Sequence, residues 1–307
     1  MASVTLAQSP KLTQNLLIAG VIEDTITVNE MFELLPFDAI SGNALQYTRE
    51  TVLGDVQLGT VDTSITANAA ATFTTVTAAL TTILGDAEVN SLIQATRSNE
   101  VDQTATQIAS KAKSVGRKYQ DMLINGTGSS NEFTGLLTLC SGGQTIDAGT
   151  NGASLTFELM DQVLDYVTDK DGQVDWLAMH RALKRKFFSI SRSVPGGNTA
   201  NDIYNLPSGK QIPAYRGTPI IANDWIPVTQ THGTSSVCTT MLAGNFDDGS
   251  RSTGIAGLTA ENAAGIEVKH VGISQSKDND IWRIRFHCGL AQFSDKGLAM
   301  VTGLLLT

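Results

Sequence analysis

The chain has 307 residues, of which 41% are hydrophobic and 17% are charged. This length and composition allow a sizeable buried core and exclude a globally disordered protein. The formal net charge is −9, and the acidic surplus lies in residues 1 to 110, which hold 3 Lys and Arg against 12 Asp and Glu, while the rest of the chain holds 18 of each. An acidic protein gains nothing from counterion release on binding nucleic acid, so sequence-specific binding of DNA or RNA is disfavoured. A function as a wall that merely surrounds nucleic acid is still allowed.

Cysteine usage and hydropathy point to a protein of a reducing cytoplasm. Cys140, Cys238 and Cys288 are odd in number and form no CxxC pair, which disfavours a disulfide framework and a zinc site. The apolar run at 16 to 22 is too short to span a bilayer and follows no basic segment typical of a signal peptide. We therefore expect a soluble protein that is not exported and has no membrane partner.

The first elements predict an arm followed by a ribbon. Residues 1 to 40 read as an extended arm, in which Asn29 caps a helical turn that ends before Pro36. The segment 43 to 52 alternates with the period of a strand, and a second β-rich run covers 71 to 80. The Gly-, Thr- and Asp-rich stretch between these runs has no large aromatic residue. A two-stranded ribbon of this composition is only marginally stable by itself, so it must lie on another part of this chain or on a neighbouring copy.

A single long helix is predicted for residues 99 to 124. Its apolar residues recur at spacings of three and four and form one stripe, and Ser98 or Asn99 is suited to cap its start. Asn125 and Gly126 are suited to end it.

The remaining chain predicts a central α/β region and a final set of strands. Helices are expected at 155 to 167, capped by Thr156, and at 181 to 192, with a buried strand at 174 to 180 between them and a polar loop at 193 to 210. From 211 onward the chain reads as strand and turn, with a half-buried strand around 282 to 288.

Motifs that carry chemistry are weak. The loop at 125 to 136 follows a helix and lacks the GxxxxGK[ST] pattern, so we interpret it as a turn and not as a phosphate site. The stretch 167 to 178 lacks calcium-loop ligands at its first and last positions, and the four histidines have no metal-ligand spacing. No serine lies in a GxSxG elbow. We predict no catalytic, cofactor or metal site. The basic face of 181 to 192 favours a solvated surface or a subunit contact over a phosphate-facing stripe.

The order of these elements resembles the major capsid proteins of tailed double-stranded-DNA bacteriophages, which share the HK97 fold. The resemblance covers nearly the whole chain and is strongest in "LLPFDAISGNALQYTRE" (34 to 50), "YQDMLINGTGSSNEFTGLL" (119 to 137) and "IPAYRGTPIIANDWIP" (212 to 227). It implies an α+β HK97-like capsid fold. Its parts would be an N-arm at 1 to 42, an E-loop β-hairpin at 43 to 84, a peripheral domain at 85 to 150 and 266 to 307 with the spine helix 99 to 124, and an axial α/β domain at 151 to 265.

The implied function is assembly of hexamers and pentamers into an icosahedral shell that encloses DNA without sequence-specific binding, as a virion capsid built in the host bacterial cytoplasm. A separate scaffold, a portal and cement proteins are the expected partners. Because no lysine lies between Lys11 and Lys111, a covalent cross-link from an E-loop lysine is excluded, and we expect a noncovalent shell. The residues expected to contact other subunits are Tyr47, Arg49, Glu50, Asp55, Asp62, Arg181, Lys184 and Arg185.

Other functions remain open from the sequence. An encapsulin-like nanocompartment shares the fold and stores a cargo enzyme instead of a genome. A hydrolase with a triad assembled from distant positions and a Thr-rich adhesin or tail component are alternatives of other classes.

Overall fold

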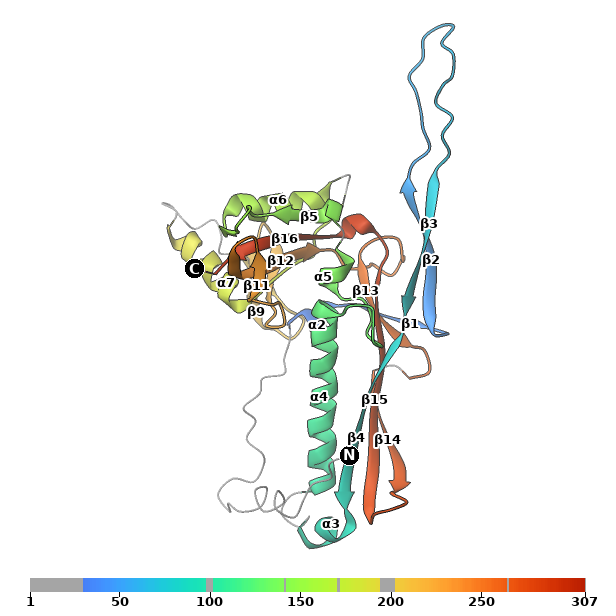
Figure 1. Cartoon of the computed structure of the whole chain (residues 1–307), viewed down its shortest axis with the longest axis vertical. Coiled ribbons are helices and arrows are strands. Elements are labelled where there is room, and N and C mark those ends of the chain that lie inside the picture. The colour runs from blue at the N-terminus through green and yellow to red at the C-terminus, as the bar shows by residue number, and fades with distance from the viewer. Residues whose placement is uncertain are drawn as a thin grey trace.

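A computed structural model describes residues 30–97, 102–140, 142–169, 172–193, 202–263 and 265–306. It is an elongated molecule with two sheets, one long helix and a protruding ribbon (Figure 1). Most of the predicted arm, residues 1 to 29, and the proposed caps Asn29, Ser98 and Asn99 lie outside the described residues.

The first sheet has five strands and lies beside the long helix α4. Its strand order is β1-β13-β15-β14, and β4 pairs with β15 as well. The strands are β1 (Phe37–Ile40), β4 (Thr81–Asn90), β13 (Ile255–Ala260), β14 (Ile266–Ile273) and β15 (Asn279–Gln292). Ile284, Phe286 and Cys288 are buried, while Arg283 on the opposite face is exposed. The alternation expected at 282 to 288 is confirmed.

The long helix α4 covers Gln103–Asn125 and starts later than predicted. Its cap is Asp102, whose carboxylate accepts hydrogen bonds from the amides of Thr104 and Ala105. A carboxylate at this position satisfies two of the amides that a helix start leaves unpaired. The C-terminal half of the predicted stripe is buried, including Val115 and Tyr119.

The second sheet has nine strands, with the path β5-β16-β12-β7-β10-β9-β8 and with β11 and β6 at its margins. Its strands are β5 (Thr145–Asp147), β6 (Ala153–Ser154), β7 (Trp176–Met179), β8 (Asp202–Asn205), β9 (Gln211–Tyr215), β10 (Thr218–Ala222), β11 (Gln230–His232), β12 (Ser235–Gly244) and β16 (Leu298–Leu305). Helices α6 (Phe157–Thr168) and α7 (Arg181–Ser193) pack on one face, and Thr156 caps α6 as predicted.

Strand β7 shows how the core is divided. Leu177 and Met179 pack with α6 and α7, whereas Trp176 and Ala178 belong to the larger cluster that contains Tyr119 of α4. All four β7 residues are therefore buried, and this strand connects the two cores.

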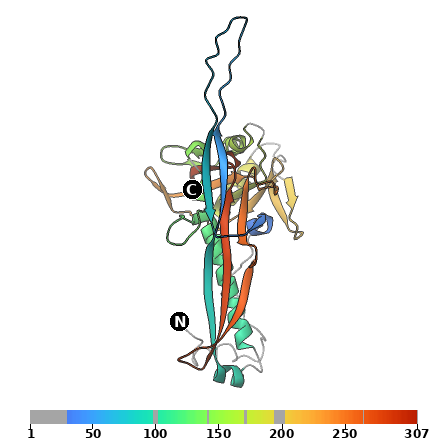
Figure 2. The same cartoon turned by 90° about the vertical axis from the view of Figure 1, so that its right-hand side faces the viewer.

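The ribbon consists of β2 (Ala44–Val52) and β3 (Thr72–Ala79), which pair only with each other among the described strands. In Figures 1 and 2, β2 and β3 run beside the body, and the outer part of the ribbon that joins them, residues 53 to 71, projects beyond it at one end of the long axis. Only Leu80 separates β3 from β4, so the ribbon continues into the five-stranded sheet.

One sequence-based expectation needs correction, because residues 202–205 form β8, paired with β9, inside the predicted polar loop. The division into a peripheral and an axial domain stays a prediction. β5 and β16, from the predicted peripheral part, are hydrogen-bonded in the nine-stranded sheet, and β13, from the predicted axial part, lies in the five-stranded one. Strand pairing here joins segments over 150 residues apart, such as β5 and β16, which local periodicity does not encode.

The loop at 125 to 136 is a turn, as interpreted, but it leads into α5 (Leu136–Leu139) and the nine-stranded sheet. The bridge between Thr127 and Thr134 closes the turn. A Cβ on Gly126 would lie 2.3 Å from the Phe133 carbonyl oxygen, so the close backbone approach requires glycine there.

Candidate subunit interfaces

The outer part of the ribbon, residues 53 to 71, exposes apolar side chains to solvent. Leu58 and Val61 are 102% and 92% exposed. The tip is organised locally, because Gln57 accepts hydrogen bonds from the amides of Thr66 and Ala67 and donates to the Ser64 carbonyl. Contiguous exposed apolar surface is unusual on a monomeric soluble protein, which makes this part of the ribbon a candidate contact surface.

The predicted acidic contact residues lie along this ribbon. Glu50 is exposed near the end of β2, and Asp55 and Asp62 are exposed farther out. Asp62 adopts a φ of 67°, a left-handed conformation that Asp tolerates well in a turn.

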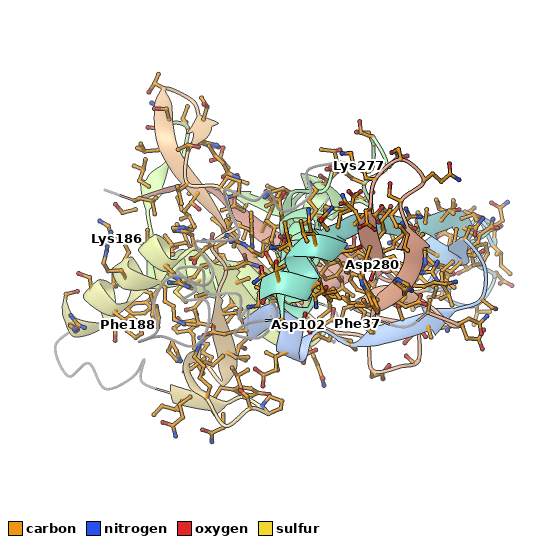
Figure 3. All side chains as sticks on the ribbon, turned by 90° about the horizontal axis from the view of Figure 1, so that it is seen from below. Phe37, Asp102, Lys186, Phe188, Lys277 and Asp280 are labelled. Atoms are coloured by element: carbon orange, nitrogen blue, oxygen red, sulfur yellow. The ribbon has the colours of Figure 1, made fainter. Side chains whose placement is uncertain are left out.

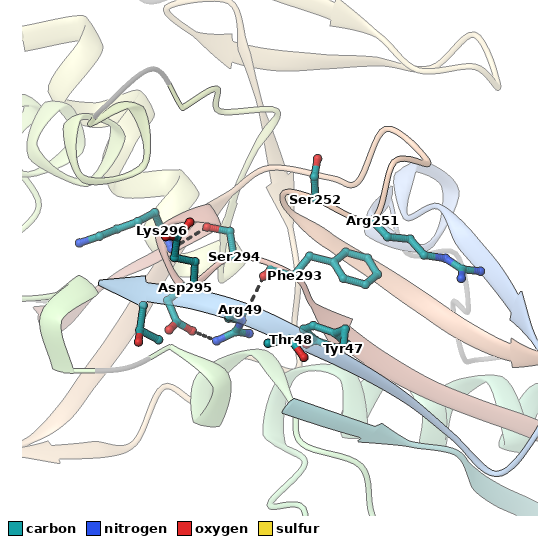
Figure 4. A pocket seen from close by; sticks show the side chains of 11 residues that line it. Tyr47, Thr48, Arg49, Arg251, Ser252, Phe293, Ser294, Asp295 and Lys296 are labelled. Atoms are coloured by element: carbon teal, nitrogen blue, oxygen red, sulfur yellow. Dashed lines mark hydrogen bonds and ion pairs between the residues drawn. The ribbon is translucent and has the colours of Figure 1, made fainter. Parts of the chain in front are cut away.

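The base of the ribbon is fastened to the body by Tyr47 and Arg49, as Figure 4 shows. The Tyr47 hydroxyl donates to the Gln292 carbonyl at 2.5 Å, and its ring lies 5.2 Å from that of Phe293. Arg49 Nε donates to the Phe293 carbonyl at 3.0 Å, and its guanidinium also donates to the Gln292 carbonyl and pairs with Asp295. We call this set the ribbon clamp: Tyr47 and Arg49 with Gln292, Phe293 and Asp295.

The clamp is half-buried. Burial raises the pKa of Tyr47, which keeps its hydroxyl protonated and able to donate. Only 14% of the Arg49 side chain is exposed. Beside the clamp, between β2 and the loop at 293 to 296, lies an open polar cleft with a volume of about 360 Å³. The clamp fixes the direction in which the ribbon leaves the body.

The predicted basic contacts lie on α7, away from the ribbon. Arg181 pairs with Asp224 at 2.8 Å, and Lys184 donates to the Ile220 carbonyl at 3.1 Å, while Arg185 is exposed. Figure 3 shows Lys186 of α7 on the far side of the molecule from Phe37, at the start of β1. Of the predicted contact residues, the structure thus brings Tyr47 and Arg49 together. The acidic residues of the ribbon and the basic residues of α7 lie apart.

A second fastening, for which no sequence pattern was found, holds α2 (Glu30–Leu34) to the nine-stranded sheet. The Glu30 carboxylate accepts from Lys210 Nζ at 2.7 Å and from the Ala222 amide at 3.1 Å. Burial raises the pKa of Glu30, but these hydrogen bonds and the charge of Lys184 outweigh it, and the net pKa lies below its ordinary value. Glu33 accepts from the amide and hydroxyl of Ser208.

The titratable side chains of the described residues form no metal-binding cluster. No three His, Cys, Asp or Glu side chains within it are placed to hold a metal ion. Two of the histidines pair with a carboxylate, His232 with Asp147 at 2.8 Å and His270 with Asp280 at 2.6 Å. The cysteines are buried and free of disulfides, and none of the described helices combines the length and hydropathy needed to cross a bilayer.

Comparison with models of known protein families shows which family the chain belongs to. The family model described as "Type 2A encapsulin shell protein SrpI-like" matches residues 80–291. The chain belongs to this family. The match includes α4 and most strands of both sheets, and it leaves out the ribbon, β1 and β16. The comparison with curated protein sequences gives no match.

Solved structures show the same fold. The cryoEM structure of the holo-SrpI encapsulin complex from Synechococcus elongatus superposes with a TM-score of 0.75 at 19% identity, covering 100% of this chain and 98% of that one. The capsid of an empty GTA particle gives 0.64 at 12% identity, covering 94% of each chain, and Mycobacterium phage Ogopogo gives 0.63 at 15%, covering 98% and 99%. The HK97-like capsid fold is confirmed, and the chain is a structural shell protein and not an enzyme.

Proposed function

We propose that this chain assembles into a closed proteinaceous compartment of the encapsulin type, which encloses protein cargo and not a genome. The observation that carries the proposal is the encapsulin shell family match over residues 80–291. The likeness to phage capsids is at identities under 25% and supports the fold alone. The hypothesis of an encapsulin-type compartment therefore has more support than the hypothesis of a phage virion capsid, which the sequence motifs favoured.

Assembly is supported by the surfaces that a lone chain leaves uncovered. The outer ribbon has five apolar side chains that are at least three-quarters exposed, namely Leu53, Val56, Leu58, Val61 and Ile65. Covering such side chains with a second copy supplies the hydrophobic stabilisation that the ribbon lacks. In this proposal Glu50, Asp55 and Asp62 meet a neighbouring subunit, and the clamp residues Tyr47 and Arg49 act by holding the ribbon in position.

The predicted division into parts is proposed in a revised form. The five-stranded sheet with α4 would serve as the peripheral domain, and the nine-stranded sheet with α6 and α7 as the axial domain. α7 offers Arg181, Lys184 and Arg185 as further subunit contacts. We also propose that the subunits form hexamers and pentamers and that the shell assembles in the bacterial cytoplasm.

The contents of purified particles test it. The full chain is expressed alone and with the proteins encoded beside it, and particles are treated with nuclease, opened and analysed for protein and nucleic acid. We expect shells that form without scaffold or portal, retain a co-expressed protein and protect no nucleic acid of defined length. Particles that need a scaffold and protect DNA of one length would identify a virion capsid instead.

A further inference from the structure

The nine-stranded sheet is split between β10 and the hairpin formed by β8 and β9. In the described chain, only Thr218 and Pro219 of β10 pair with β9, beside the turn that connects the two strands. The next three residues, 220 to 222, pair with β7 alone, and the first half of β9 pairs with β8 alone. We call the gap between β10 and the β8–β9 hairpin (residues 202 to 215) the split.

A proline in β9 accounts for the split. The backbone groups of successive strand residues point to opposite sides, and the Asn223 amide donates to the Met179 carbonyl of β7. The Ile220 carbonyl and the Ala222 amide therefore point toward β9. The next step of the register pairs Ile220 with Pro213, and proline has no N–H to donate. The ladder between β9 and β10 loses a hydrogen bond at this position.

Two charged side chains take the place of the missing backbone partners. Lys184 of α7 donates from Nζ to the Ile220 carbonyl at 3.1 Å. The Glu30 carboxylate of α2 accepts from the Ala222 amide at 3.1 Å and from Nζ of Lys210, next to the hairpin turn, at 2.7 Å. The side chains of Glu30 and Lys184 are only 10% and 15% exposed. The buried edge of β10 is thus satisfied by side chains that a continuous sheet would not need.

The helix α2 also contacts the hairpin directly. Met31 is fully buried in the core cluster that contains Ile212 of β9. Glu33 accepts hydrogen bonds from the amide and the hydroxyl of Ser208 at 2.6 and 3.1 Å. Figure 1 shows α2 near β9, and only two residues separate α2 from β1 of the five-stranded sheet. α2 therefore connects the hairpin to the other sheet.

We propose that α2 is a removable wedge that holds the β8–β9 hairpin away from β10 and couples the position of the hairpin to the five-stranded sheet. With α2 in place, the Ala222 amide bonds to Glu30. With α2 displaced, the hairpin moves against β10 and the same amide bonds to the carbonyl of Gln211, which the continued register places opposite it. We call this arrangement the closed state. Lys184 satisfies the Ile220 carbonyl in both states, so the two arrangements differ by few bonds, as a two-state element requires.

The wedge sets the position of the outer edge of the hairpin. Among the described strands, β8 pairs with β9 alone, and it exposes Ile203 and Tyr204. An unpaired edge with exposed apolar residues is a place where another chain can add. Displacement of α2 would therefore move a binding edge. This device is built from contacts within one chain, so it does not rest on the proposed shell function.

Spin labels measure the position of the hairpin in the purified full chain. One label is attached through Asn205→Cys on β8 and the other through Ser189→Cys on α7, both at exposed positions, and the native cysteines are buried. Labelled protein is diluted into unlabelled protein, so that only distances within one chain are measured. The wedge variant is Glu30→Lys, which places a like charge beside the two lysines of the split. The matched control is Glu132→Lys, which reverses an ion-paired glutamate outside the split.

We expect one dominant distance in the chain with native Glu30. Glu30→Lys should increase the population of a second distance at least about tenfold, because it removes two hydrogen bonds to a charged group. The second distance should differ by about 5 Å, since paired strands lie about 4.8 Å apart whereas a helix needs about 10 Å. Glu132→Lys should leave the distribution unchanged. An unchanged or merely broadened distribution in Glu30→Lys, in protein whose circular dichroism matches wild type, would overturn the wedge.

A second variant tests the closed state without changing α2. Pro213→Ala gives β9 the N–H that it lacks, so it should favour pairing with β10. Alone or combined with Glu30→Lys, it should raise the closed population about threefold or more. The matched control is Pro207→Ala in the exposed turn of the hairpin. If Pro213→Ala raises the closed population no more than this control does, β9 does not close onto β10 and the proposal is wrong.

Discussion

Replacing Arg49 with methionine should release the base of the ribbon. Methionine keeps an unbranched side chain of similar reach but removes every donor of the clamp. The lost interactions are the hydrogen bonds from the guanidinium to the carbonyls of Gln292 and Phe293 and the ion pair with Asp295.

The expected cost follows from the burial of these groups. Each hydrogen bond from the charged, mostly buried guanidinium contributes about 1.5 kcal/mol. The pair with Asp295, whose side chain is 48% exposed, adds less than about 1 kcal/mol. A loss of about 3 kcal/mol corresponds to roughly a 150-fold increase in the population with the base detached.

Amide hydrogen exchange in subunits released from particles measures this opening. A two-stranded ribbon is marginal alone, so detachment of its base exposes the amides of β2 and β3 to exchange. The matched control is Thr48→Ala, the neighbouring position in β2, whose side chain is exposed. If Arg49→Met accelerates exchange in β2 and β3 by less than about threefold, or no more than the control does, the clamp does not hold the ribbon.

Three further predictions concern α2, the core and the absence of covalent linkage. Glu30→Gln should lower the unfolding free energy at neutral pH. Because the folded pKa of Glu30 lies below its ordinary value, the difference in unfolding free energy from wild type should shrink as the pH falls below about 4.3. Urea unfolding at several pH values measures this difference, and a difference that grows in acid would contradict the prediction. Trp176→Ala should cost about 3 to 5 kcal/mol in urea unfolding of released subunits, because Trp176 is fully buried in the larger core, and a cost below about 1 kcal/mol would contradict that packing. Boiling assembled particles in detergent should release a 32.5 kDa chain, whereas a ladder of multimers would show covalent links.

The helices and most strands could be predicted because their signals are local. The alternation in "NALQYTRETV" predicts β2, and the apolar spacing with Thr156 as cap predicts α6. The short strand β8 was missed because its four residues lie in a polar segment and gain their order from pairing with β9. The start of α4 was placed too early because several polar residues near it are suited to cap a helix, and Asp102 takes that role.

The interfaces were predictable only in part. Exposure of the outer ribbon follows from the lack of large aromatic residues between its two strands, but the fastening of its base does not, since Tyr47 and Arg49 contact residues more than 240 positions away. The same holds for Glu30 and Lys210, which are 180 positions apart. Whether Tyr47, Arg49, Arg181, Lys184 and Arg185 also touch other subunits stays a prediction.

Electron microscopy of the purified full chain, expressed without other proteins, shows whether this chain alone builds a closed shell. We expect closed, hollow particles of uniform diameter that lack packaged nucleic acid. A chain that stays monomeric at high concentration, with its ribbon protected from hydrogen exchange, would contradict it.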